Sequence, residues 1–239
     1  MNIAIQGTVK KAKELFETPH VVTSSIEHPA ILETLRALEI EGVEVTYLTP
    51  NEKGVIDNKE FKDSLRKETC LAVFSYVNSE IGNILPVEEL VRSLRHFRRH
   101  ETGEKYPYFL LDVTQAATCF DLNVQKLGVD LLVLDGSKVG GLKGSGLLFV
   151  KEGVEIHPLL YGGGQEEGLR PGTENILAIE SLRIALSIAQ EKVEEESERL
   201  GEISRFFCRR INKRDQPSEH KRKYRQYDSA HCKCVLQRS

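Results

Sequence analysis

The stretch Leu131-Leu132-Val133-Leu134-Asp135-Gly136-Ser137-Lys138 is followed closely by Gly140-Gly141-Leu142-Lys143-Gly144-Ser145-Gly146. Four consecutive apolar residues ahead of a polar, glycine-containing segment are typical of a strand that is buried on both faces of a sheet. The glycines that follow predict a loop, so we expect Lys138 just past the end of the strand. A lysine held there can be desolvated, which makes its amine nucleophilic.

A second candidate side chain ends the upstream apolar run Tyr108-Phe109-Leu110-Leu111-Asp112. Because the carboxyl ends of parallel strands meet at one edge of a sheet, Asp112 and Lys138 are expected at the same edge. A lysine that forms a Schiff base and a carboxylate that keeps the ring nitrogen protonated are what pyridoxal phosphate requires of a protein. The pair therefore indicates a pyridoxal phosphate site.

Short apolar strands alternate with amphipathic helices along the chain. His28-Pro29-Ala30 begins one helix and Pro86 begins another, each with leucines and other apolar residues on one stripe. This alternation predicts an α/β fold, with a mostly parallel sheet that is covered by helices on both faces. The expected strands are 20–24, 43–48, 70–77, 108–112, 129–135 and 146–151.

The composition indicates a globular protein. At 239 residues, 40% of them hydrophobic, the chain can form a sizeable core. No run approaches the roughly twenty apolar residues of a membrane helix, and no signal pattern opens the chain. The five cysteines, at 70, 119, 208, 232 and 234, are odd in number and irregularly spaced, which argues for a reducing compartment. We therefore expect a cytoplasmic protein, with Cys70 and Cys119 as core residues.

The C-terminal part differs from the rest of the chain. Residues 175–207 form the longest helical pattern, and the charged second half of this pattern predicts a helix that leaves the domain body. Residues 212–239 have few apolar side chains and no periodicity, which is typical of disorder. The net charge of −3 conceals a basic segment from Arg209 onward. We divide the chain into a domain at 1–205 and a basic, disordered tail at 206–239.

Six separated motifs carry a resemblance to a known family. In their order and spacing they resemble the cysteine desulfurases, within the class V aminotransferases, over residues 2 to 205. The resemblance implies an incomplete large domain of a fold-type I pyridoxal phosphate enzyme. It would remove sulfur from L-cysteine, leaving alanine and a persulfide for iron–sulfur cluster assembly or other sulfur transfer. The motifs are Val21-Val22-Thr23-Ser24-Ser25-Ile26-Glu27-His28-Pro29-Ala30, Asn78-Ser79-Glu80-Ile81-Gly82, Asp112-Val113-Thr114-Gln115-Ala116-Ala117, Gly136-Ser137-Lys138, Gly162-Gly163-Gly164-Gln165-Glu166 and Arg170-Pro171-Gly172-Thr173-Glu174-Asn175.

The resemblance implies roles at four positions: Lys138 and His28 as catalytic residues, and Asp112 and Gln115 as cofactor-binding residues. Lys138 matches the Schiff-base lysine, and Asp112 matches the partner of the pyridinium nitrogen. Gln115 matches the donor to the phenolic oxygen of the cofactor. His28 matches the imidazole that lies over the cofactor ring and transfers protons, a task suited to a group that titrates near neutral pH.

Three further positions are implied to bind the cofactor. Asn78 matches a cofactor-facing amide, and Ser137 falls where the family places a phosphate-binding side chain. Thr173 matches the threonine that reaches the phosphate of the neighbouring subunit, so the resemblance implies a homodimer. It also implies a scaffold protein as the sulfur acceptor.

Taken singly, the same residues have structural explanations. His28 before Pro29 fits a helix start, Asp112 fits an Asx-turn, and Lys138 in a glycine-rich loop fits a solvated surface residue. Their joint presence in family order favours the cofactor site. His96, His100 and His157 stand outside the motifs, and we expect them on the surface.

The chain departs from the family pattern at single positions. Asp135 stands where the family usually has a small hydroxyl residue near the phosphate. A carboxylate about 4 Å from a phosphate would cost on the order of 4 kcal/mol per charge pair at an effective dielectric near 20. Either Asp135 turns away or cofactor binding is weakened. Ser137 replaces a histidine and Ser79 replaces an asparagine, so a charge and an amide are lost.

Two family segments have no counterpart in the sequence. These are the N-terminal segment with its phosphate cradle and the C-terminal small domain with its sulfur-accepting cysteine, so independent turnover is in doubt. Cys232 or Cys234 could take the acceptor role, since neighbouring basic groups lower a thiol pKa. His231-Cys232-Lys233-Cys234 could instead be half of a zinc site, although four ligands at recognisable spacing are lacking.

Two other functions remain open at this point. A selenocysteine lyase, a kynureninase-like enzyme or an aminotransferase would use the same cofactor residues. A catalytically silent fragment that pairs with a full-length partner is the non-enzymatic alternative. Nucleic-acid binding is disfavoured, because only the tail is basic and no aromatic stacking platform accompanies it.

Overall fold

The computed structural model of the chain describes residues 1–52, 54–103 and 105–214. One six-stranded sheet has the strand order β2-β1-β3-β4-β5-β6. Neighbouring strands from β2 to β5 pair in parallel, and β6 lies antiparallel to β5. The mostly parallel sheet is therefore confirmed, and every expected strand is present to within two residues at each end. The strands are β1 His20–Ser24, β2 Glu44–Leu48, β3 Thr69–Ser75, β4 Tyr108–Asp112, β5 Leu131–Asp135 and β6 Gly146–Val150.

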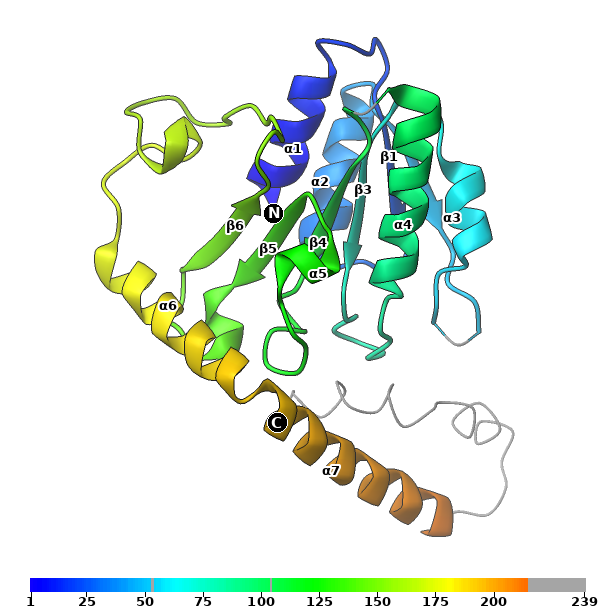
Figure 1. Ribbon diagram of the computed structural model, residues 1–239, viewed down its shortest axis with the longest axis vertical. Helices are drawn as coiled ribbons and strands as arrows, with labels where there is room; N and C mark the ends of the chain where they lie inside the picture. The colour runs from blue at the N-terminus through cyan, green and yellow to red at the C-terminus, as the bar shows by residue number, and fades with distance from the viewer. Residues whose placement is uncertain (53, 104, 215–239) are drawn as a thin grey trace.

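Helices cover both faces of this sheet, as predicted (Figure 1). Alternate side chains of one strand enter different cores: Val73 packs with α1 and α2, whereas Phe74 packs with α3 and α4. Each core is a continuous cluster of buried apolar side chains, which is why the strands read as unbroken apolar runs. The helices of the body are α1 Asn2–Ala12, α2 Pro29–Ile40, α3 Asn58–Ser64, α4 Val87–Phe97, α5 Val124–Leu127 and α6 Ile176–Glu191.

Short helical turns lie between these elements. A π-helical turn, η1 (Arg98–Thr102), continues α4, and two 3-10 turns follow β5 and the loop after β6. These 3-10 turns are η2 (Gly136–Val139) and η3 (Glu166–Gly168). The strand-to-helix connections β1–α2, β3–α4 and β4–α5 all leave the carboxyl edge of the sheet, where residues 24, 75, 112 and 135 end their strands.

The amino edge of the sheet is held by buried polar groups. Asp130, at 2% exposure of its side chain, pairs with Arg98 at 2.5 Å and accepts the Phe109 N–H at 2.9 Å. His20 bridges three strands, since its Nδ1 lies 2.9 Å from the Thr69 hydroxyl and its Nε2 lies 2.8 Å from the Thr46 hydroxyl. The hydrogen bonds of Asp130 join β4 to β5, and those of His20 join β1 to β2 and β3. Both sets lie at the amino edge, opposite the carboxyl edge of the sheet.

The long C-terminal helix is interrupted, unlike the single pattern expected from the sequence. α6 ends at Glu191, Lys192 leaves the helical range at φ −102° and ψ 8°, and α7 runs over Val193–Arg214. The interruption falls where the apolar residues that pack against the body give way to charged ones. Figure 1 shows α7 running on below the sheet, where Leu200 and Ser204 are still buried, so this helix is less solvated than expected.

The tail begins later than expected. Residues 206–214 continue α7, so the expectation of disorder from residue 206 is wrong for them. A side-chain contact one turn apart supports the helix here: the Arg210 guanidinium lies over the Phe206 ring, 5.2 Å from its centroid. The remainder of the predicted tail, 215–239, lies outside the described residues.

The His20 bridge generates a pH prediction. Burial lowers the pKa of His20 from 6.5 to about 4 in the folded chain, with Arg66 adding to the effect. The native state therefore binds this proton less readily than the unfolded state. The contribution of neutral His20 to stability is fully present above pH 6.5 and is lost as the pH falls toward 4.

We expect the free energy of unfolding to fall more steeply between pH 6.5 and pH 4 in the wild type than in His20→Gln, by about 2 kcal/mol over that interval. Urea unfolding at several pH values measures the difference. Parallel curves for the two proteins would show that His20 is not the titrating group.

Candidate functional site

Two aspartates end neighbouring strands at the carboxyl edge. Asp112 at the end of β4 accepts the Thr114 N–H at 2.9 Å, and Asp135 at the end of β5 accepts the Ser137 N–H at 2.9 Å. The turns are joined, because the Asp135 N–H donates to the Thr114 hydroxyl at 3.2 Å. The same Asx geometry therefore turns the chain sharply at both strand ends and holds them together.

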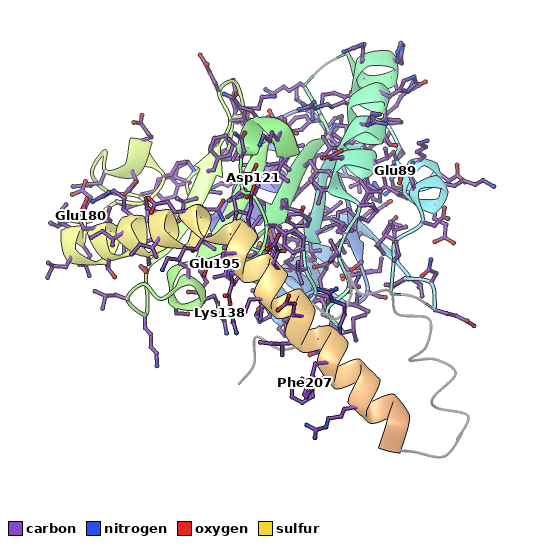
Figure 2. The ribbon with its side chains drawn as sticks, turned by 60° about the horizontal axis from the view of Figure 1, so that its bottom comes forward. Glu89, Asp121, Lys138, Glu180, Glu195 and Phe207 are labelled. Carbon is purple, nitrogen blue, oxygen red and sulfur yellow. The ribbon has the colours of Figure 1, made fainter. Side chains whose placement is uncertain are left out.

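Lys138 lies in η2, directly after β5, and its side chain is exposed. Figure 2 shows it below the sheet, on the side where α6 passes into α7. Gly136, the first residue of η2, is required at its position, since a Cβ there would stand 2.1 Å from the Ser145 hydroxyl. α6 fixes the loop that follows, because Ser181 accepts the Leu142 N–H at 3.0 Å. The lysine is thus carried by a turn with little freedom to shift.

His28 is the N-cap of α2, and its imidazole is exposed. Its Nδ1 accepts the Ala30 N–H at 3.1 Å. A neutral imidazole that accepts through Nδ1 carries its proton on Nε2, so the cap assigns the tautomer. The free Nε2–H is left as the group that can meet a ligand.

Asn78 is buried and heavily committed to the backbone. Its Nδ2 donates to the Ile26 carbonyl at 2.6 Å, while its Oδ1 accepts from Glu80 at 2.8 Å and from Ile81 at 3.1 Å. Both acceptor sites of the amide oxygen are used, and one amide hydrogen remains for a ligand. Asn78 therefore shapes the loop after β3 whether or not it also meets a cofactor.

The remaining candidates divide into two groups. Gln115, in the turn after β4, and Ser137, in η2, are half-buried at the same edge as Asp112. Thr173 is exposed in the loop between η3 and α6, which Figure 1 shows outside the sheet on its β6 side. The structure thus gathers Lys138, Asp112, Gln115, His28, Asn78 and Ser137 at the carboxyl edge, and it leaves Thr173 to one side.

A buried carboxyl group that the sequence analysis did not single out adjoins this site. Glu27 is 8% exposed, and burial raises its pKa, with a further contribution from the nearby Asp112 carboxylate. The amino group of Met1 also lies near Asp112; burial lowers the pKa of that group, and the Asp112 charge opposes the shift. The signal that could have identified Glu27 is its place beside His28, within the motif that follows β1.

The other cysteines and histidines that the structure describes have different surroundings. Cys70 and Cys119 are buried, as predicted, and burial raises the pKa of the Cys70 thiol to about 12. His96 and His100 are exposed and face each other at 4.4 Å, while the half-buried His157 pairs with Glu14 at 2.5 Å. Across the part of the chain that the structure describes, no three His, Cys, Asp or Glu side chains are grouped to hold a metal. Cys232 and Cys234 fall outside it.

Comparisons with known proteins identify the family. The family model described as "Aminotransferase class-V" matches residues 1–236. The chain belongs to the class V aminotransferases. These are pyridoxal phosphate-dependent enzymes, and the described sheet with its flanking helices is the large domain of fold-type I. No helix in the described ranges has the length and apolar character needed to cross a membrane.

Named relatives are cysteine desulfurases. The chain is 37% identical to "Cysteine desulfurase IscS" of Dictyoglomus turgidum over 89% of its own length and 52% of that protein. It is 39% identical to "Cysteine desulfurase IscS" of Methanosarcina thermophila over 83% of this chain and 47% of that protein. The solved structure "Crystal structure of DndA from streptomyces lividans" superposes with a TM-score of 0.73 at 32% identity, covering 88% of this chain and 57% of that one. The chain spans about half the length of the relatives it matches.

The donor set at the carboxyl edge fits pyridoxal phosphate. A carboxylate, an amine, an imidazole with a free Nε2–H and a side-chain amide are present, which suit the ring nitrogen, the aldehyde, the ring face and the phenolic oxygen. The exception is the phosphate. Asp135 occupies the Ser137 N–H and brings a negative charge to the turn where a phosphate-binding group was expected.

A substitution that removes only this charge tests its effect. In Asp135→Asn the side-chain oxygen can still accept the Ser137 N–H, so the turn is kept. We expect the dissociation constant for pyridoxal phosphate to fall about tenfold, since a partly screened repulsion of about 1.4 kcal/mol is relieved. Titration followed by visible absorbance measures it. Equal affinities would mean that the Asp135 carboxylate does not face the phosphate.

Proposed function

We propose that the chain is the cofactor-binding part of a pyridoxal phosphate-dependent cysteine desulfurase. The observation that carries the proposal is that Asp112 ends β4 and Lys138 lies in the turn after the adjacent strand β5, while His28 begins α2 on the same edge of the sheet. The relatives named as cysteine desulfurases share this region at 35–39% identity, which supports the substrate class. L-Cysteine is accordingly the proposed substrate.

Each side chain has a chemical task in this function. Bound pyridoxal phosphate supplies an electron sink for the negative charge that develops at the substrate α-carbon. Asp112 holds a proton on the ring nitrogen, because a carboxylate raises the proton affinity of a nitrogen beside it. Lys138 supplies the amine that binds the cofactor covalently, and Gln115 donates to the phenolic oxygen. Ser137 offers a hydroxyl to the phosphate.

His28 is the proposed proton carrier. In the capped, neutral ring the Nε2–H can donate a hydrogen bond to a ligand. To carry a proton, Nδ1 must release the Ala30 N–H and take up a proton, after which Nε2 can give up its own. Because the cap is a backbone hydrogen bond at the start of α2, the ring is oriented before any ligand arrives. Asn78 stays a proposed cofactor contact through its one remaining amide hydrogen.

The proposed assembly is a cytoplasmic homodimer with a sulfur-acceptor scaffold protein as a further partner. Thr173 supports the dimer, since it is exposed in the loop before α6 rather than in a turn at the end of a parallel strand. In the dimer it would contact the phosphate of the partner subunit. Cys232 and Cys234 stay proposed alternatives for sulfur acceptance. Another class V activity is the second candidate, because Lys138, Asp112 and Gln115 serve chemistry that the family shares.

Covalent capture of the cofactor tests the central assignment. We expect pyridoxal phosphate to give a visible absorbance band with the wild type and to remain on the Lys138 peptide after borohydride reduction, as read by mass spectrometry. Lys138→Ala removes the amine and should abolish both signals. Lys143→Ala is the matched control, because Lys143 is also exposed in the glycine-rich segment that follows.

Substrate assays separate the two candidate functions. Sulfide release from L-cysteine that requires Lys138 supports the desulfurase, whereas amino transfer without sulfide release supports the second candidate. A band of equal strength in Lys138→Ala, or reduction product on Lys143 instead, contradicts the assignment of Lys138.

A further inference from the structure

Glu27 is a buried carboxyl group with no role in the function proposed above. It lies in the connection from β1 to α2, immediately before His28, and is 8% exposed. Glutamate is almost never fully buried unless its charge or hydrogen-bonding capacity is met. Its contacts therefore show what the burial accomplishes.

Both carboxyl oxygens of Glu27 are used. Oε1 accepts the Ser24 hydroxyl at 2.6 Å, and Oε2 accepts the Ser75 N–H at 2.9 Å. The first contact closes the connection on itself at the end of β1. The second contact crosses to the end of β3, so the carboxyl group ties the segment that carries His28 to the neighbouring strand.

The tie leads directly to Asp112. Ser75 is the cross-strand partner of Asp112, and the next residue, Tyr76, donates its N–H to the Asp112 carbonyl at 2.9 Å. A short chain of contacts thus runs from His28 through Glu27 and Ser75 to Asp112. The pKa of Glu27, raised by burial and by the Asp112 charge, is a second sign that the two carboxyl groups lie within electrostatic reach.

The same segment is pinned from its other side. Asn78 donates to the Ile26 carbonyl at 2.6 Å, one residue before Glu27. Ile26 and Glu27 are therefore both fastened to the loop and strand end of β3, and His28 follows them with its imidazole fixed by the α2 cap. Of these three hydrogen bonds, only the one accepted by the Glu27 carboxyl group involves Ser75, the cross-strand partner of Asp112.

We propose that Glu27 is a positioning residue of the cofactor site, whose carboxyl group fixes the His28 segment to the end of β3 and so sets the place of the imidazole relative to Asp112. The proposal rests on the proposed function, since it concerns the site where the cofactor is to bind. Its consequence is that the proton-carrying ring and the ring-nitrogen partner form one rigid unit, although they belong to the start of α2 and the end of β4.

Two substitutions separate the tie from the charge. Glu27→Ala removes both hydrogen bonds. Glu27→Gln keeps them, because the amide oxygen can accept the Ser75 N–H while the amide nitrogen donates to the Ser24 hydroxyl, which is able to accept. Ser24→Ala removes one contact alone and serves if Glu27→Ala fails to fold. Thr69→Val is the matched control: it removes the His20 contact at the opposite end of β3 and lowers stability without touching the site.

The first measurement needs no cofactor. Amide hydrogen exchange of the 239-residue chain is followed at Ser75 and over residues 25–32. We expect exchange there to become about tenfold faster in Glu27→Ala, the size of one lost buried hydrogen bond, and to stay within about threefold of wild type in Glu27→Gln. Thr69→Val should leave this segment at its wild-type rate relative to the rest of the sheet.

The second measurement adds pyridoxal phosphate and reads its dissociation constant by visible absorbance and its induced circular dichroism at saturation, which reports a fixed ring orientation. We expect Glu27→Ala to raise the dissociation constant about tenfold and to weaken the induced signal. Glu27→Gln and Thr69→Val should resemble wild type. A purely structural role would make Thr69→Val and Glu27→Ala equally defective.

The outcomes decide the two proposals separately. Unchanged amide hydrogen exchange in Glu27→Ala overturns the positioning role. A Glu27→Gln protein that binds the cofactor as weakly as Glu27→Ala also overturns it, because the charge of Glu27 and not its hydrogen bonds would then matter. If amide hydrogen exchange differs between wild type and Glu27→Ala as expected, but the wild type binds no pyridoxal phosphate, the proposed function is overturned instead. Wild-type binding and wild-type induced signal in Glu27→Ala would restrict the tie to stability and reject its role in the site.

Discussion

Parallel pairing of β1 with β3, of β3 with β4 and of β4 with β5 is the constraint on which the rest of the structure depends. Each strand must be followed by a connection that returns to the opposite edge, so the carboxyl ends of all these strands gather at one edge. Residues far apart in sequence, such as His28 and Asp112, are brought to the same edge by this rule alone. The candidate site residues of the proposed function, Thr173 excepted, lie at the strand ends and in the connections that this pairing places at the carboxyl edge.

Backbone demands at those turns select the same residue types that chemistry demands. A turn after a buried strand leaves N–H groups that need an acceptor, and Asp112 and Asp135 supply it through Asx geometry. His28 supplies it for α2. The structural and functional explanations of these residues are therefore not alternatives. The hydrogen bond that closes the turn uses one oxygen of each aspartate and the Nδ1 of His28. The second polar atom of each side chain takes no part in that turn, and its direction is fixed by it.

The sheet and the edge could be predicted from the sequence because they depend on short-range patterns. The apolar run at 131–134 marks a strand wherever it lies, and Pro29 marks a helix start. The resemblance placed the candidate residues, and the structure adds their geometry. The departures lay where the sequence pattern does not show a change of backbone: α6 ends at Glu191, and α7 continues through 206–214, past the expected end of the domain.

Glu27 illustrates why the rest of the site escaped prediction. In the sequence it is a charged residue beside a histidine, and nothing local states that Ser75, 48 residues away, will present a backbone N–H to it. Long-range ties of this kind depend on register: a shift of β3 against β1 by one residue would turn the Ser75 amide away and strand a buried carboxyl group. The same register sets Ser75 opposite Asp112. A single alignment of three strands thus satisfies a buried carboxyl group and assembles the two ends of the candidate site, which makes the packing of the sheet and the geometry of the site one problem.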